Sequence, residues 1–149
     1  QLTVYTASSR RRWAEKLAVK RGVADRVRWC EALPPEALGA ALAQHDLALE
    51  PLTPSERNLV QGCMPIKVLD YLRAGVAVVA PDLPVVRAMT GPEAPLYRPW
   101  SRQSLVDTIR DLAGSDRTAV VRAGQDRVEA LFSERAQAAA LRAVYRAVA

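Results

Sequence analysis

The sequence predicts a single α/β domain built on a Rossmann-like, doubly wound parallel sheet. The first observation is the order of patterns: from Leu2 to Ala80, short runs of β-forming residues alternate with longer amphipathic segments. This β-α-β-α-β order is typical of a parallel sheet with helices on both faces. The second observation is size, because 149 residues, 50% of them hydrophobic, can build one core but leave no room for a second domain.

Four strands and a short edge strand are expected where β-branched, aromatic and other apolar residues cluster. The first three are rich in β-forming residues. The fourth is a continuous apolar run, as expected for a strand that helices cover on both faces. The four strands are expected at 2–6, 26–30, 46–50 and 77–80, and the edge strand at 95–97.

The segments between and after the strands carry helix signals. Serines or prolines stand where helices would begin, and apolar residues follow at the spacing of one buried face. A turn or short helix is expected at 82–89. Longer helices are expected from Ser8 or Ser9 to Gly22, from Pro34 or Pro35 through Leu42, from Ser101 or Ser104 through Leu112, at 120–131, and from Ser133 to Val148.

The segment between Pro65 and Gly75 predicts a short helix with a polar start. Pro65 suits the first helical position, because its missing N–H would have no intrahelical partner there. Gly75 suits a left-handed stop after the last turn. Lys67 and Asp70, three residues apart, share one face near the helix start. The buried face is expected to consist of Val68, Leu69 and Leu72.

The start of this helix is predicted to bind a nucleotide. First-turn N–H groups are unpaired and the helix dipole is positive there, so the backbone at 66–68 can hold a phosphate. Asp70 lies about 4–5 Å further along the axis, roughly a phosphate-to-ribose step, and can accept hydrogen bonds from ribose hydroxyls. The alternative is a surface ion pair between Lys67 and Asp70, and the spacing alone does not decide between the two.

The stretch from 51 to 64 shows neither a helical nor a strand period and is predicted to be a loop. It follows a predicted strand, and ligands of open α/β sheets bind at the carboxyl ends of the strands. We therefore expect it to border the ligand site. Its polar side chains are Ser55, Glu56, Arg57, Asn58 and Gln61.

Composition argues against a nucleic-acid partner and against a metal site. The net charge is +5 and the pI about 9.7, but the basic residues are scattered along helical stretches. The run 10–12 is favoured as a solvated helix start over a site for phosphates or an anionic membrane. Cys30 and Cys63 lack metal-ligand spacing, and His45 is the single histidine. With no membrane span or signal peptide visible, a soluble cytoplasmic protein is expected.

A resemblance to a known family appears between Pro65 and Asp82, which read PIKVLDYLRAGVAVVAPD. This block resembles the donor-site block of the retaining GT-B glycosyltransferases (group 1, family 4-like), whose pattern begins P-x-K-x-x-E. Pro65, Lys67 and Gly75 match it, and Asp70 stands where the family has its ribose-binding glutamate. The resemblance covers nearly the whole chain.

Other positions depart from the family pattern. The segment 25–33 resembles a family stretch whose following loop lies near the donor base, but Glu31 replaces a glycine. Ala77 replaces a proline. Gly62 stands where many members carry the first glutamate of an E-x7-E pair, which removes a carboxylate expected near the donor sugar.

The resemblance implies the C-terminal, donor-binding half of a GT-B fold and a hexosyltransferase-like enzyme. The donor would be a UDP-sugar or GDP-sugar, transferred with retention, in bacterial cell-surface polysaccharide synthesis. No metal cofactor is expected, because the chain has no Asp-x-Asp motif and the helix start with Lys67 supplies positive charge. No catalytic residue is assigned. The expected donor-nucleotide contacts are Leu33, Met64, Pro65, Ile66, Lys67 and Asp70.

The resemblance also implies that this chain is part of a longer, two-domain transferase. A central strand that precedes the first one in the family is not found here, so 2–6 and 46–50 would either pair directly or leave a gap. An acceptor-binding N-terminal domain would be missing, and the isolated chain would be inactive. The last helix carries an apolar stripe that predicts either self-association or an exposed patch that binds a hydrophobic dye. The full-length enzyme would be able to associate peripherally with a membrane. The stripe comprises Leu141, Val144, Tyr145 and Val148.

Two alternatives of different kinds remain at the level of sequence. A nucleotide-sugar epimerase can share the same architecture, although it would need acid and base side chains facing the sugar, and a single histidine speaks mildly against it. A non-catalytic phosphate-binding or interaction module would keep the sheet without needing Asp70.

Overall fold

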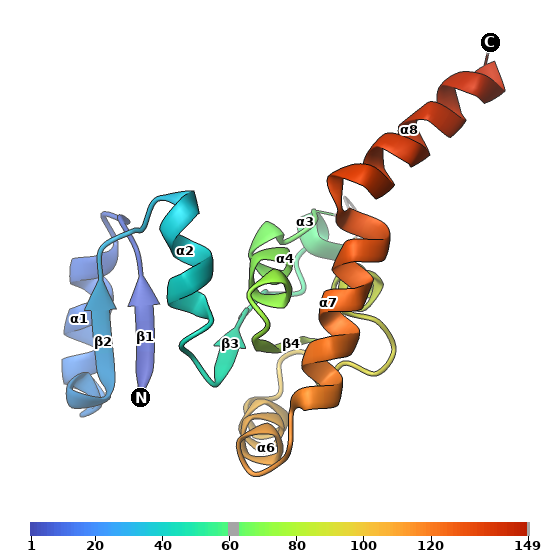
Figure 1. Ribbon diagram of the computed structural model, residues 1–149. Coiled ribbons are helices and arrows are strands. Elements are labelled where there is room, and N and C mark those ends of the chain that lie inside the picture. The colour runs from blue at the N-terminus through green and yellow to red at the C-terminus, as the bar shows by residue number, and fades with distance from the viewer. Residues whose placement is uncertain (60–62, 149) are drawn as a thin grey trace. The chain divides into compact units, whose positions relative to one another are not determined.

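The computed structural model describes residues 1–59 and 63–148 and divides the chain into two compact units, Gln1–Leu38 and Gly39–Ala149. Each unit is described by itself. Both contain parallel strands joined by helices (Figure 1). The α/β class and the parallel strand pairing predicted from the sequence are therefore confirmed.

The first unit is a β-α-β arrangement. Strand β1 (Leu2–Tyr5) pairs in parallel with β2 (Val27–Cys30). Helix α1 (Arg11–Lys20) and the short 3-10 helix η1 (Ala24–Arg26) connect the two strands. Ala18 is the only buried residue of this unit, so its core is small.

The second unit contains a three-stranded parallel sheet in the order β3-β4-β5. Its strands are β3 (Leu47–Leu49), β4 (Ala77–Pro81) and β5 (Leu96–Tyr97). The central strand β4 was predicted as a continuous apolar run, and all of its residues are buried. A strand of this kind requires helices on both faces of the sheet.

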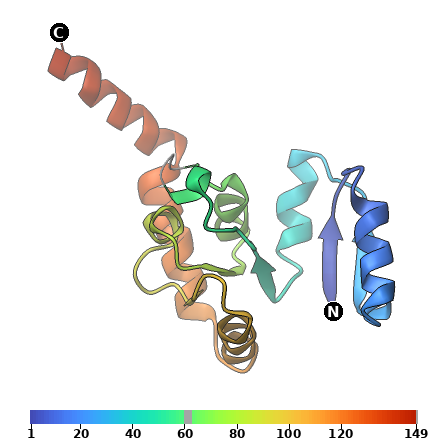
Figure 2. The same cartoon turned by 180° about the vertical axis from the view of Figure 1, so that it is seen from behind.

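Seven further helices complete the described part of the chain. Helix α2 begins in the first unit and ends in the second, and the others belong to the second unit (Figures 1 and 2). Their bounds are α2 (Pro35–Leu42), α3 (Glu56–Leu59), α4 (Ile66–Arg73), α5 (Pro84–Thr90), α6 (Arg102–Ala113), α7 (Thr118–Phe132) and α8 (Glu134–Val148).

Two apolar clusters cover the two faces of the β3-β4-β5 sheet. Val78 and Ala80 of β4 belong to a cluster with residues of α4, α5 and α7. Val79, which points to the opposite face, packs with Leu112 of α6 and with Tyr97. The alternation along β4 therefore separates the α4 face from the α6 face, which is the doubly wound arrangement predicted from the sequence.

Helix starts agree with the sequence prediction at two of three capping serines. Ser101 caps α6 by accepting a hydrogen bond from the Ser104 N–H (3.1 Å), and Ser133 accepts one from the Ala136 N–H (3.2 Å) at the start of α8. The prediction for α1 is wrong, because Arg10 is its N-cap and makes no side-chain cap. There the Ser8 hydroxyl bonds to the Arg10 N–H instead, outside the helix.

Two other features differ from or refine the sequence prediction. The stretch 51–64, predicted to be a loop, contains the four-residue helix α3 within its described part. Strand β1 pairs with β2, and β3 pairs with β4. The expectation that 2–6 and 46–50 pair directly or leave a gap stays a prediction.

The last helix leaves its apolar stripe uncovered. Helix α8 packs against α7 and otherwise extends away from the rest of the second unit (Figures 1 and 2). None of its described residues is buried. The four predicted stripe residues are among the most exposed large apolar side chains of the chain: Leu141 at 56%, Val144 at 60%, Tyr145 at 65% and Val148 at 77%.

Candidate functional site

The start of α4 lies at the carboxyl edge of the three-stranded sheet. The chain reaches it from the carboxyl end of β3, and α4 then leads back into β4. Pro65 is the N-cap, in an extended conformation (φ −76°, ψ 92°), and the helix begins at Ile66. The prediction that Pro65 occupies the first helical position is therefore wrong by one residue, because its backbone is extended rather than helical.

The first turn of α4 offers two open N–H groups rather than three. The Val68 N–H donates to the Pro65 carbonyl oxygen (2.9 Å), so it is not free for a ligand as the sequence predicted. No hydrogen bond of the Ile66 or Lys67 N–H is found within the described ranges. These two groups, at the positive end of the helix dipole, are the backbone donors that the helix start can present.

Gly75 and the apolar face fix the rest of α4. Gly75 has φ +72°, and its N–H donates to Leu72 while the Val76 N–H donates to Tyr71, which forms the left-handed helix stop predicted from the sequence. Val68 and Leu72 are buried on the face toward β4. The position of α4 is therefore fixed by the stop at Gly75 and by the packing of Val68 and Leu72.

The side chains predicted to bind the donor differ in exposure. Met64 (45% exposed), Ile66 (70%) and Lys67 are exposed, Pro65 is buried and Asp70 is half-buried. No ion pair joins Lys67 to Asp70. The surface ion pair considered as the alternative is therefore not formed, and Lys67 is an exposed residue.

The other predicted residues lie on other elements. Leu33 is half-buried in the connection after β2, and it belongs to the first unit. Ser55, Glu56 and Arg57 are exposed at the start of α3. Gln61 and Gly62 lie outside the described residues.

Glu50 belongs to this region of the fold, although the sequence pattern did not predict it as a site residue. It directly follows β3, and its N–H donates to the Val79 carbonyl oxygen (3.0 Å), which extends the pairing with β4. Its exposed fraction is 7%, and its Oε2 has no hydrogen-bond partner in the described part of the chain. A charged residue at the end of an otherwise apolar strand, just before a loop, was the sequence signal that could have identified it.

The charges around Glu50 act on each other. Burial raises the pKa of Glu50, and the positive charge of Lys67 opposes that shift. Burial also raises the pKa of Tyr71, with smaller contributions from Glu50 and Asp70. The pKa of Tyr97 is raised by burial and by Glu50. Glu50 is therefore electrostatically coupled to α4 and to the end of β5.

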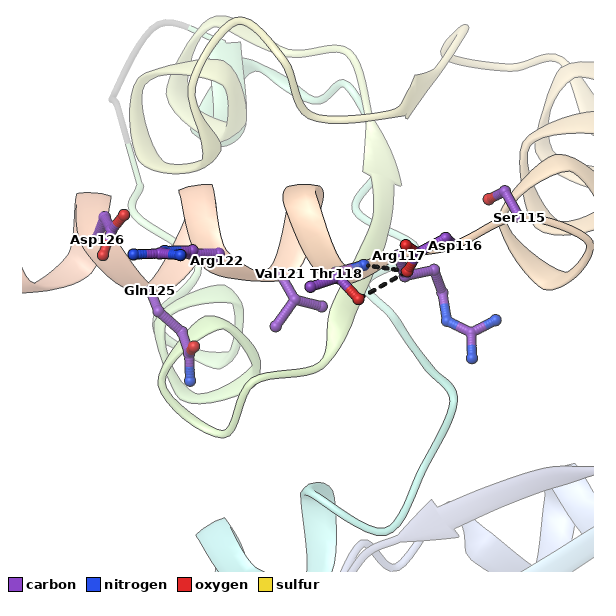
Figure 3. Close-up of a pocket in the computed structure, with 8 residues that line it drawn as sticks. All are labelled: Ser115, Asp116, Arg117, Thr118, Val121, Arg122, Gln125 and Asp126. Atoms are coloured by element: carbon purple, nitrogen blue, oxygen red, sulfur yellow. Dashed lines mark hydrogen bonds between the residues drawn. The ribbon is translucent and has the colours of Figure 1, made fainter.

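An open pocket of about 630 Å³ lies elsewhere, at the connection between α6 and α7 (Figure 3). Asp116 accepts hydrogen bonds there from the Thr118 N–H (2.9 Å) and hydroxyl (2.6 Å), which lower the pKa of Asp116. Arg117 donates to the Leu112 carbonyl oxygen (3.0 Å) and to Asp46 (3.5 Å), which precedes β3. These polar groups secure the start of α7 at the amino edge of the sheet, opposite the start of α4.

No metal or membrane element is found in the part of the chain that the structure describes. Within 1–59 and 63–148, no cluster of three or more His, Cys, Asp or Glu side chains could hold a metal ion. Over the same ranges, no helix has both the length and the apolar composition needed to cross a membrane.

Comparisons with solved structures show the fold. A sucrose-phosphate synthase from Thermosynechococcus elongatus is similar over 99% of this chain and 38% of its own length, with a TM-score of 0.77 and 20% identity. WaaG, a glycosyltransferase involved in lipopolysaccharide biosynthesis, is similar over 86% of this chain and 33% of its own length, with a TM-score of 0.63 and 20% identity. The chain thus spans about a third of the length of these two proteins.

The sequence comparison shows the family. No curated protein matches the chain. Residues 1–115 match the family glycosyl transferases group 1, and this range contains both parallel strand pairings of the second unit and the whole of α4. The chain therefore belongs to the glycosyl transferases group 1 family.

Proposed function

We propose that the chain is the donor-binding part of a glycosyltransferase and that it holds the nucleoside diphosphate of a UDP-sugar or GDP-sugar at the start of α4. The observation that carries the proposal is this helix start, with two open N–H groups and an exposed lysine at the carboxyl edge of a parallel sheet. Membership of a glycosyltransferase family supports a transferase rather than a phosphate-binding module.

Each residue of the helix start has a separate role in this proposal. The N–H groups of Ile66 and Lys67 donate to a phosphate oxygen, and the Lys67 ammonium adds a charge-assisted bond. Asp70, one turn further on, accepts hydrogen bonds from the ribose hydroxyls. Met64 contributes apolar surface near the nucleotide. The acceptor is held by a part of the transferase that this chain does not contain.

Replacing Asp70 tests the proposal directly. Asp70→Ala should weaken the binding of UDP or GDP by about 1–3 kcal/mol, because two hydrogen bonds to a charged group are lost. Isothermal titration measures the affinity, and thermal unfolding shows whether the variant remains folded. Asp126→Ala, an exposed aspartate in the middle of α7, is the matched control and should leave affinity unchanged.

The same titrations separate the other outcomes. If Asp70→Ala is folded and binds UDP and GDP as well as the wild type does, Asp70 is only a surface charge and the proposed site is wrong. Repeating the titration after EDTA treatment tests the role of metals. We expect unchanged affinity, because the helix start and Lys67 supply the positive charge. A strict requirement for Mg²⁺ or Mn²⁺ would contradict this charge assignment.

A further inference from the structure

Glu50 is buried at the end of β3 and is part of no ion pair that the structure describes. Leu47 and Leu49 of β3 pack with the cluster on the α6 face. Because side chains alternate along an extended strand, Glu50 is on the opposite face, which α4 covers. Its electrostatic coupling to Lys67, in the first turn of α4, agrees with this placement.

The carboxylate of Glu50 lacks the partners that a buried charge needs. Buried polar atoms are nearly always hydrogen-bonded, and a carboxylate removed from water requires donors. Oε2 of Glu50 has none in the described residues, although the residue is only 7% exposed. Lys67, the cation to which it is coupled, forms no ion pair within the same ranges. The structure thus holds a buried acceptor with unused capacity that is electrostatically coupled to the first turn of α4.

We propose that Glu50 is a further binding residue of the donor site and that its carboxylate accepts hydrogen bonds from hydroxyl groups of the sugar joined to the diphosphate; this inference rests on the proposed function. Glu50 would then determine which glycosyl group the site accepts. It is not assigned to the phosphates, because a carboxylate repels them and the N–H groups of Ile66 and Lys67 already suit them.

The position of the ribose supports the same choice. Asp70 lies one turn into α4, so a nucleotide that follows the helix has its ribose there and its diphosphate at the helix start. The group beyond the diphosphate then lies past the start of α4, at the carboxyl edge of the sheet, where β3 ends just before Glu50. Sugar hydroxyls are hydrogen-bond donors, and an unpaired carboxylate is the acceptor that they suit.

The test compares nucleoside diphosphates with nucleotide sugars. Isothermal titration with UDP, GDP, UDP-glucose and GDP-mannose is carried out on the wild type, Glu50→Leu and Glu50→Gln. Glu50→Leu should leave the affinity for UDP or GDP within about twofold and lower the affinity for the corresponding nucleotide hexose about tenfold. Glu50→Gln keeps one acceptor oxygen, so its affinity for the nucleotide hexose should lie between those of the wild type and Glu50→Leu. Glu93→Gln, an exposed glutamate before β5 at the amino edge, is the matched control and should change neither affinity.

Three results would overturn the proposal. If Glu50→Leu changes the affinity for the diphosphate and for the nucleotide hexose equally, Glu50 acts only through its charge on Lys67 and does not bind the sugar. Unchanged affinity for both ligands in folded Glu50→Leu would remove Glu50 from the site while leaving the proposed function intact. If the wild type binds no nucleotide at all, the proposed function fails, and this inference fails with it. Should Glu50→Leu not fold, the same comparison is made with Glu50→Gln, whose shape is nearly that of glutamate.

Discussion

At the scale of single residues, the start of α4 combines an exposed cation with a buried anion. Lys67 is open to solvent, while Glu50 is nearly inaccessible and its ionisation is opposed by burial. Keeping a carboxylate in such a place costs stability unless donors satisfy it. A binding site can retain a group of this kind because a ligand satisfies it, even though the empty protein would be more stable without it.

This cost leads to a pH-dependent difference between the wild type and Glu50→Gln. Burial raises the pKa of Glu50 in the folded state, so folding favours the protonated carboxyl group. This contribution to stability is fully present below the unfolded carboxyl pKa of about 4.3, and it is lost as pH rises through the folded pKa. Glutamine has no such loss. The advantage of Glu50→Gln in free energy of unfolding should therefore grow as pH rises from about 4.3 and level off above the folded pKa. Urea unfolding at a series of pH values measures it, and a difference that stays constant over pH would contradict the buried position of Glu50.

At the scale of elements, the ends of α4 were largely predictable from the sequence because they depend on local backbone chemistry. Gly75 adopts the left-handed conformation that its position suggested, and Pro65 marks the start to within one residue. The bond from the Val68 N–H to Pro65, which removes one expected donor, depends on the detailed path of the chain before the helix. Glu50 was missed because its burial is set by distant elements, and the local signal, a charged residue at the end of an apolar strand, does not report burial.

The short helix α3 and the first cap illustrate the same limit. A four-residue helix shows too few periodic positions to be recognised in a sequence. At α1 two serines were available as caps, yet Arg10 occupies the N-cap while Ser8 bonds within the preceding turn. Strong local signals were enough to predict that a helix is present. Its first residue depends on which of several neighbouring polar groups forms the capping hydrogen bond, and the sequence does not show that.

Helix α4 packs against α7 closely enough that a single added methyl group should disturb the contact. A methyl group added at Gly124 of α7 would lie 2.6 Å from Cδ2 of Leu72, a core side chain of α4 that is 6% exposed. Overpacking of this kind costs about 1–3 kcal/mol, against about 1 kcal/mol gained from the helix propensity of alanine. Gly124→Ala should therefore lower the free energy of unfolding, by up to about 2 kcal/mol, in urea denaturation.

Gly39→Ala is the matched control for that substitution. Gly39 lies inside α2, and a methyl group there would meet nothing within 4 Å. The same change should raise the free energy of unfolding by about 0.5–1 kcal/mol, because only the unfolded chain loses freedom. If both variants are stabilised equally, the contact between α4 and α7 is looser than the structure indicates.

At the scale of the whole molecule, the uncovered surface of α8 is the feature that most affects behaviour in solution. The helix carries a contiguous apolar stripe and no buried residue in its described length. Monomeric proteins seldom expose such a surface. The stripe itself carries no charge, so the net charge of +5 lies on other residues.

We expect the chain either to self-associate through this stripe or to bind a hydrophobic dye. Light scattering over a range of concentrations and dye fluorescence measure the two outcomes. Replacing Leu141 and Val144 together by Gln should reduce whichever signal is present. Ala139→Gln, an exposed position on the other side of α8, should not. A wild-type chain that is monomeric at all concentrations and binds no dye would show that the stripe is covered in solution.

The small core of the first unit bears on how the chain would respond to hydrogen exchange. Only Ala18 is buried there, whereas the second unit buries the whole of β4. The free energy of local opening follows buried apolar contacts. Amides of β1 and β2 should therefore exchange through a low-energy opening, while those of β4 exchange only when the second unit unfolds globally, and the polypeptide would behave as two cooperative folding units of unequal stability.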